Sequence, residues 1–266
     1  MYYLSSWKHY CKAHGFDLII IDKVLDTSER SKERSIAWQK CLILNHPDVA
    51  KYDTVVWIDA DIVINSKAPD ISLNVPVGKI GAVDMFSSPT PAEYDAIRLR
   101  YNQKLLAMGL NECLLPQTPN EYHSSWGLPV HQVNMESVVQ TGVLVLNPSI
   151  HSEFLQRVYD TYEDKELSKW HYEMRPLSYE IQKQLLFHRL DYRFNIIWHE
   201  QLWYHYPFLE NYIPPCTVEK VLRKITFHKY RTRFQSLLHH CAVSVYDKSF
   251  FLHFAGAHED VHYLFR

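Results

Sequence analysis

The stretch YDTVVWIDADIVIN, residues 52–65, joins a strand pattern to two carboxylates. The apolar run VVWI (55–58) is typical of a buried strand, and Asp59 and Asp61 follow where that run ends. Side chains alternate along an extended chain, so both carboxylates leave the same face. They repel each other unless a cation lies between them, and a divalent metal is the simplest such cation. An Asp-x-Asp motif is usually a solvated pair of acids, but the apolar residues on both sides favour metal binding here.

The rest of the chain alternates between predicted helices and strands. Besides the strand before Asp59, apolar runs predict strands at 17–22, 79–85, 141–147 and 249–256. Helical patterns cover 1–14, 28–46, 91–109, about 150–163 and about 177–189, and 110–136 reads as a loop. This order predicts an α/β fold with a mostly parallel sheet and helices on both faces. Asp59 then lies at the carboxyl end of a central strand, where such sheets bind ligands.

Composition narrows the class of protein. The 266 residues include 30 acidic and 28 basic ones, so no charge excess indicates a nucleic-acid partner. Glycine occurs only 7 times, and the glycine-rich phosphate-binding motifs are absent from the sequence. Five scattered cysteines favour a reducing compartment over disulfides or a zinc cluster. No apolar run of about 20 residues occurs. A cytoplasmic protein and a soluble catalytic fragment of a membrane-anchored Golgi-type enzyme both fit these features.

Four segments together resemble one family. They are YCKAHGFDL (10–18), the block from Arg34 to Asp61, QTGVLVLNPS (140–149) and FLHFAG (251–256). In this order, and over nearly the whole chain, they resemble nucleotide-sugar glycosyltransferases of the GT-A fold. The most similar group contains fungal Golgi α-mannosyl- and α-galactosyltransferases and plant xyloglucan xylosyltransferases, and the glycogenin-like group is also similar. Family members begin with a strand that contacts the nucleotide base, whereas this sequence begins in the helix that follows.

The resemblance implies a single glycosyltransferase domain over 1–266, with 198–245 as a candidate acceptor-side appendage. It implies that Asp59, Asp61 and His253 hold Mn²⁺ or Mg²⁺ on the diphosphate of a UDP- or GDP-linked sugar. The remaining site residues implied are Lys40, Ala60 and Gly256 for the donor, with Lys40, Gln140 and Glu180 as catalytic candidates. The implied reaction is retaining transfer of a hexose or pentose to a hydroxyl of a glycan, protein or lipid.

Each implied role has a simpler structural alternative. His253 is one of 16 histidines, and the alternative is a core histidine bonded to a backbone carbonyl. Lys40 could be solvated on a helix, Gln140 could satisfy backbone groups, and Glu180 could cap a helix. The aromatic segment 198–215 is either an acceptor platform or packing, and the basic segment 219–234 is a solvated face or an anionic-ligand or membrane surface.

Two other classes of function remain open. Residues 59–63 also fit the D-x-D-x-[TV] motif of haloacid-dehalogenase phosphatases, in which the first Asp is a nucleophile. The later acidic Gly-Asp motif of that family is absent from the sequence. The other alternative is an inactive relative that binds sugar or protein. Release of nucleoside diphosphate, of inorganic phosphate or of neither product would separate the three.

Overall fold

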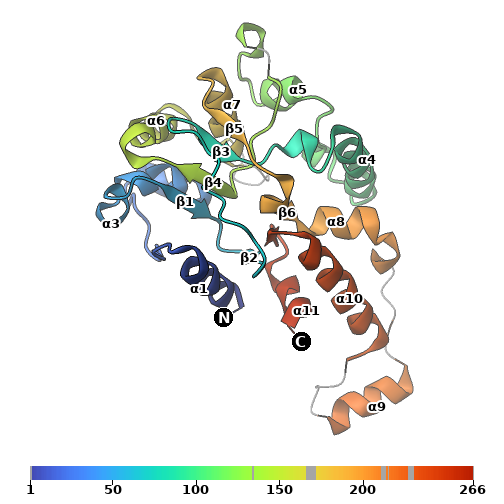
Figure 1. Cartoon of the computed structure of the whole chain (residues 1–266). Coiled ribbons are helices and arrows are strands. Elements are labelled where there is room, and N and C mark those ends of the chain that lie inside the picture. Colours follow the sequence, from blue (N-terminus) through green and yellow to red (C-terminus); the bar gives the residue numbers. More distant parts are fainter. Residues whose placement is uncertain are drawn as a thin grey trace.

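A computed structural model describes residues 2–133, 135–165, 172–210, 214, 216–226 and 231–265. Two small β-sheets lie side by side, with helices around them (Figure 1). One sheet has the strand order β1-β4-β3-β5 and the other has the order β2-β7-β6. Their bounds are β1 Val55–Ile58, β2 Ile62–Ile64, β3 Ile80–Ala82, β4 Val143–Leu146, β5 Phe187–Arg189, β6 Ile196–Ile197 and β7 Phe251–His253.

The predicted α/β class is confirmed, but the strand directions differ from the expectation of mostly parallel pairing. Pairs β3–β5 and β6–β7 are parallel, whereas β1–β4, β3–β4 and β2–β7 are antiparallel. Strand β4 runs opposite to both of its neighbours, which alternation of helices and strands does not reveal. Asp59 does follow the carboxyl end of β1, but β1 is an edge strand of its described sheet rather than a central one.

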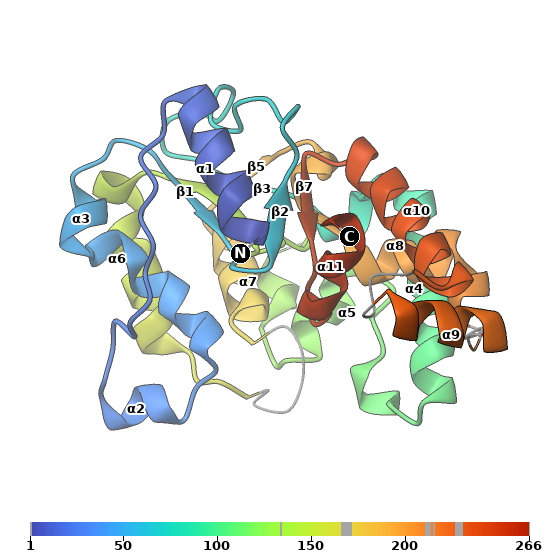
Figure 2. The same cartoon turned by 90° about the horizontal axis from the view of Figure 1, so that it is seen from below.

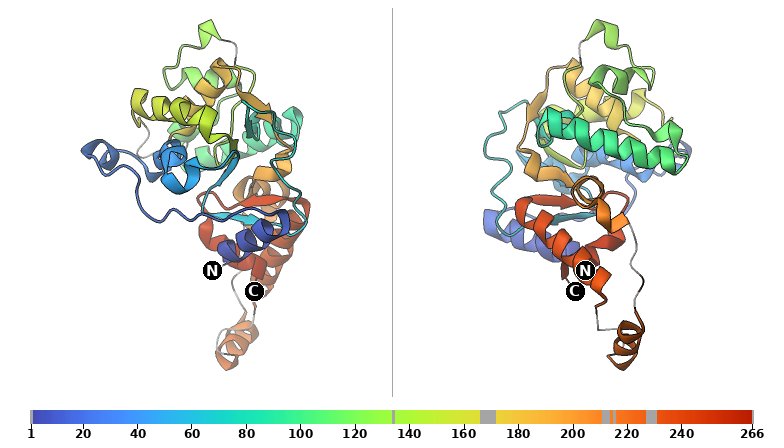
Figure 3. Two further views of the ribbon diagram at one scale, coloured as in Figure 1. Left: turned by 60° about the vertical axis from the view of Figure 1, so that its left-hand side comes forward. Right: turned by 90° about the vertical axis from the view of Figure 1, so that its right-hand side faces the viewer.

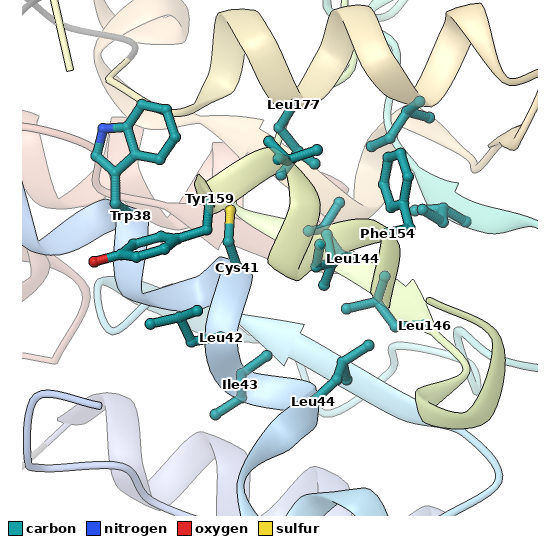
Figure 4. Close-up of a cluster of buried hydrophobic side chains, with 14 of the residues drawn as sticks. Trp38, Cys41, Leu42, Ile43, Leu44, Leu144, Leu146, Phe154, Tyr159 and Leu177 are labelled. Carbon is teal, nitrogen blue, oxygen red and sulfur yellow. The ribbon is translucent and has the colours of Figure 1, made fainter. Parts of the chain in front are cut away.

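The largest core lies between the four-stranded sheet and two helical segments. The 3₁₀ helix η1 (Ile36–Asn45) packs against α6 (Pro148–Thr161). Trp38 and Leu44 of η1 meet Leu144 of β4 and Phe154 of α6 there (Figure 4). The sequence predicted one helix over 28–46. The structure has a short α2 (Glu29–Lys32) and then η1, in which six residues are buried.

The N-terminal helix α1 (Tyr2–His14) lies across β2 (Figure 2). Trp7 Nε1 donates to the carbonyl of Ile62 at 2.7 Å, and Tyr10 Oη donates to the carbonyl of Pro69 at 2.8 Å. The strand predicted at 17–22 is wrong, because this segment forms no β-ladder in the described residues. Instead, 16–21 and β1 line an apolar groove of about 270 Å³, which separates the segment from the edge of β1.

Several of the remaining helices pack in pairs. Helix α4 (Pro91–Ala107) packs against α8 (Trp198–His205), and α10 (Arg233–Lys248) packs against α11 (His262–Phe265). Helix α9 (Thr217–Ile225) stands away from the sheets (Figure 3). The other α-helices of the described residues are α3 (Pro47–Ala50), α5 (Pro119–Ser124) and α7 (Met174–Lys183). The further 3₁₀ helices are η2 (Met85–Ser87), η3 (Asn111–Cys113), η4 (Val130–Gln132), η5 (Tyr192–Asn195), η6 (Pro207–Glu210) and η7 (His258–Val261). Parts of the predicted appendage 198–245, namely 211–213, 215 and 227–230, lie outside the described residues. In the described chain, none of the helices has the length and apolarity needed to cross a membrane.

Candidate functional site

Strand register brings Asp61 and His253 together. Strands β2 and β7 pair so that Ile62 lies opposite His253, which places Asp61, one residue before β2, at the same end of the ladder. The backbone N–H of Phe254 donates to the carbonyl of Asp61 at 2.9 Å and extends the pairing. As a result, His253 Nε2 lies 3.0 Å from Asp61 Oδ1, although 192 positions separate the two residues in the sequence.

Asn195 fixes the orientation of the imidazole. It precedes β6, whose Ile196 pairs in parallel with Leu252 of β7, and its Oδ1 lies 2.9 Å from His253 Nδ1. The amide oxygen accepts from Nδ1–H, so Nε2 of a neutral ring presents a lone pair to Asp61. Two acceptors at that distance require a proton or a metal ion between them. Burial opposes ionisation of Asp61, but the hydrogen bond and charge of His253 lower the pKa of this carboxyl below its usual value.

Gly142 allows the imidazole to lie against β4. A Cβ on this residue would lie 2.7 Å from His253 Cε1 and 2.9 Å from Nδ1, closer than real Cβ contacts. The carbonyl of Gly142 accepts from the N–H of Asp59 at 2.8 Å. The start of β4 therefore supports both the Asp-x-Asp turn and His253.

Asp59 is held in a second, more deeply buried group. Lys40 Nζ lies 3.0 Å from Asp59 Oδ1 and 2.9 Å from Glu173 Oε1, and it donates to the carbonyl of Thr141 at 3.1 Å. Trp57 Nε1 also donates to Asp59 Oδ1, at 2.8 Å. Burial alone would lower the pKa of Lys40, but Asp59 and Glu173 raise it above its usual value. Burial raises the pKa of Glu173, with Lys40 opposing. The ammonium group is thus a fixed positive charge.

The Asp61–His253 pair fits two positions around a hard divalent ion. Ligands at right angles, with bonds of about 2.1 Å to the metal, lie roughly 3 Å apart, which matches the separation of Oδ1 and Nε2. Asp59, bonded to Lys40, does not complete the set: the described residues hold no group of three or more His, Cys, Asp or Glu residues placed for a metal. Asp59 as a third ligand stays a prediction that requires its carboxylate to turn away from Lys40.

The other predicted residues are placed as follows. Gln140 lies two residues before Gly142, and its N–H donates to the carbonyl of Val83 at 2.9 Å. Glu180 lies on α7 and accepts from Tyr162 Oη at 2.6 Å. Its other recorded partners, Lys183 and Gln184, are neighbours in sequence. Ala60 is exposed in the turn between β1 and β2, and Gly256 takes a positive φ of 67° after β7.

The structure therefore groups Lys40 with Asp59, and Asp61 with His253, on the two sides of one turn. The resemblance did not identify three residues that hold these groups: Gly142, Glu173 and Asn195. Gly142 has a local signal, since a glycine opening a buried apolar strand indicates a close approach. Glu173 and Asn195 have none, because their role comes only from tertiary contacts with Lys40 and His253.

Comparison with known proteins identifies the fold. No protein-family model matches the chain, and no curated protein matches it either. A solved glycosyltransferase involved in the glycosylation of the major capsid of PBCV-1 is similar over 98% of this chain and 89% of its own, with a TM-score of 0.50 and 14% identity. The bifunctional glycosyltransferase WbbM is also similar, with a TM-score of 0.40 and 13% identity over 83% of this chain and 32% of its own. The first likeness shows that this chain has the fold of a glycosyltransferase.

Proposed function

We propose that this protein is a metal-dependent, retaining glycosyltransferase. It moves a hexose or pentose from a UDP- or GDP-linked donor to a hydroxyl group of a glycan, protein or lipid. The observation that carries the proposal is the Asp61–His253 pair, with its 3.0 Å separation, at the start of β2 and the end of β7 in a chain with a glycosyltransferase fold. Donor, acceptor and stereochemistry come from the sequence resemblance.

The residues have distinct tasks in this proposal. Asp61 and His253 would hold Mn²⁺ or Mg²⁺, and such an ion would supply positive charge to a nucleoside diphosphate leaving group. Asn195 keeps His253 Nε2 directed at the site, as hydrogen-bonded outer residues do for ligating histidines. Lys40 holds Asp59 by a charge-assisted hydrogen bond, and Asp59 would join Asp61 and His253 at the metal by turning its carboxylate away from Lys40.

The remaining residues keep the roles that the resemblance implies. Gln140 contacts the donor sugar or the acceptor, and Ala60 and Gly256 belong to the donor site. Glu180 is a candidate for the donor sugar, but its recorded hydrogen bonds and ion pair lie with Tyr162 and its own helix.

The test compares product release across a donor panel. UDP-glucose, UDP-galactose, UDP-xylose and GDP-mannose are incubated with the protein, with and without MnCl₂. Release of nucleoside diphosphate only in the presence of metal is the expected result. Release of inorganic phosphate instead would indicate the phosphatase, and release of neither product would indicate an inactive relative. A thermal shift in the same mixtures identifies the donor that binds, since a ligand of the native state raises the unfolding temperature.

A further inference from the structure

Helix α9 turns apolar side chains toward solvent. Of its nine residues, all of which the structure describes, Glu219 alone is buried. Val218, Val221 and Ile225 are 66%, 48% and 68% exposed. Successive residues are about 100° apart around a helix, so these three and Leu222 lie within roughly 100° of one another and form one face, here called the α9 stripe. The apolar stripe of a surface helix normally packs on the core of its own protein, and the α9 stripe does not.

The buried side of α9 attaches it to the start of α10. Glu219 Oε1 accepts from the backbone N–H of Arg233 at 2.7 Å, and Glu219 Oε2 accepts from the backbone N–H of Cys216 at 2.8 Å. Glu219 lies roughly 110° around the helix from the middle of the α9 stripe. The attachment therefore leaves the stripe free, and α9 stands clear of both sheets in every view (Figures 1 and 3).

The residues of the α9 stripe do not suit a helix that remains in water. Valine and isoleucine lose side-chain freedom in a helix and are weaker helix formers than alanine or leucine. A helix of nine residues is also too short to be stable in water on its own, and most helices in proteins are stabilised by packing of their apolar face. Burial of the α9 stripe in a second apolar phase would supply that stabilisation.

Basic side chains border the α9 stripe. Lys220 and Lys224 are exposed, and the described residues provide no ion pair for either of them. Lys224 is three positions from Val221, so it is a direct neighbour of the stripe on the helix surface. Helix α9 contains a third basic residue, Arg223, and a single acid, Glu219, whose carboxylate already has partners. An apolar face with lysines beside it is typical of helices that lie in the interface of a membrane.

We propose that α9 binds an anionic lipid surface. The α9 stripe enters the boundary between the headgroups and the acyl chains, and Lys220 and Lys224 reach the anionic headgroups on their flexible stems. Each lysine near such a surface strengthens binding roughly fivefold. A lipid surface fits better than a second copy of the chain, because two copies paired through the stripe would bring lysines of the same charge together. This binding needs neither donor nor metal and is independent of the proposed glycosyltransferase activity.

The experiment measures co-sedimentation of the full chain with lipid vesicles, without donor or metal. One set of vesicles contains phosphatidylcholine and phosphatidylglycerol in equal parts, and the other contains phosphatidylcholine alone. Val218→Ser/Ile225→Ser tests the α9 stripe. Its matched control is Leu99→Ser/Leu106→Ser, which alters two exposed leucines of α4 at the same spacing in the sequence. Thermal unfolding of each variant verifies that it is folded.

A second comparison tests the charge. Lys220→Gln/Lys224→Gln is compared with Lys23→Gln/Lys67→Gln, which removes the same charge from exposed positions elsewhere. We expect the α9 variant to bind anionic vesicles about 25-fold more weakly than wild type, and the control variant to bind as wild type does. Raising the salt from about 0.1 M to about 1 M shortens the Debye length from about 10 Å to about 3 Å and should also weaken binding.

For the stripe, we expect wild type and Leu99→Ser/Leu106→Ser to bind anionic vesicles equally, and Val218→Ser/Ile225→Ser to bind at least about tenfold more weakly. Binding to vesicles of phosphatidylcholine alone should be weaker for every protein. Absence of wild-type binding to anionic vesicles, or equal binding by Val218→Ser/Ile225→Ser, overturns the proposal. Sedimentation velocity without vesicles tests the other occupant. A wild-type dimer that Val218→Ser/Ile225→Ser converts to a monomer would show that a second copy occupies the stripe and would also overturn the proposal.

Discussion

Gly142→Ala tests how closely β4 supports the Asp61–His253 pair. The new Cβ would lie 2.7 Å from His253 Cε1, so the imidazole must shift by about 0.7 Å to reach ordinary contact near 3.4 Å. Such a shift disturbs both His253 hydrogen bonds. Displacing an outer support of a metal ligand typically weakens metal binding by about 10- to 100-fold. This corresponds to a loss of about 1.4 to 2.7 kcal/mol of metal-induced stabilisation when the metal is in excess.

The assay is thermal unfolding with and without MnCl₂, followed by turnover with the donor found in the panel. At about 2 °C per kcal/mol for a chain of this size, the Mn²⁺-induced rise in Tm should be roughly 3 to 5 °C smaller in Gly142→Ala than in wild type. The matched control is Gly81→Ala in β3, whose Cβ would lie 2.7 Å from Val75 Cγ2. Overpacking costs each variant about 1–3 kcal/mol of stability, but only Gly142→Ala should change the response to Mn²⁺. An unchanged Mn²⁺ response in Gly142→Ala would mean that the position of His253 does not matter for metal binding.

Three further predictions follow from buried charges and from Asn195. Lys40→Met leaves the Glu173 carboxylate buried without its cation, so it should lower the free energy of unfolding by about 3 kcal/mol or more in a denaturant titration. The double variant Lys40→Met/Glu173→Gln should recover much of that stability. Equal stability of the single and double variants would reject the Lys40–Glu173 pairing. Burial raises the pKa of Glu200 to about 7 in the folded protein, against an ordinary value of 4.5. Between these two pH values the folded state binds a proton that the unfolded state does not, so this group stabilises the folded protein fully below about pH 4.5, and that stabilisation is lost as the pH rises through 7. Glu200→Gln should therefore gain up to about 3 kcal/mol relative to wild type between pH 5 and pH 8, and a pH-independent difference in Tm would contradict this. Asn195→Ala should weaken Mn²⁺ binding about tenfold, and the Mn²⁺-free stability should change less than the Mn²⁺ affinity does. The affinity is measured from the rise in Tm as Mn²⁺ is titrated into each protein.

The sequence predicted those helices and strands that are specified by capping residues or by a continuous apolar run. Helix α4 begins at Pro91 after the capping residue Thr90, and Gly109 follows its end. Proline at the first position and glycine after the last are the sequence signals that predicted this helix. Strand β4 is continuously apolar because it is buried on both faces. The segment 17–22 has the same apolar character but forms no ladder, because pairing depends on a neighbouring strand at the right distance rather than on composition.

The sequence predicted that four charged or ionisable candidate residues lie near one another, but it did not predict the residues that support them. Asp59, Asp61, Lys40 and His253 belong to short motifs, and the structure brings them to one turn. The Asp-x-Asp motif does not reveal that its two aspartates have different partners. Lys40 contacts Asp59, whereas the pairing of β2 with β7 places Asp61 beside His253. Glu173 is seven positions from the predicted Glu180 on the same segment, yet only Glu173 contacts Lys40.

A Mn²⁺ titration of nucleoside diphosphate release compares wild type with two histidine variants. His253→Ala removes the proposed ligand, and His240→Ala removes an exposed histidine of α10 as a control. We predict that wild type and His240→Ala share one Mn²⁺ dependence. We predict that His253→Ala retains its fold, loses turnover at low Mn²⁺ and regains part of it only at a large excess of the metal. Turnover by His253→Ala with the wild-type Mn²⁺ dependence, or equal turnover by wild type in EDTA, would show that Asp61 and His253 do not hold a catalytic metal.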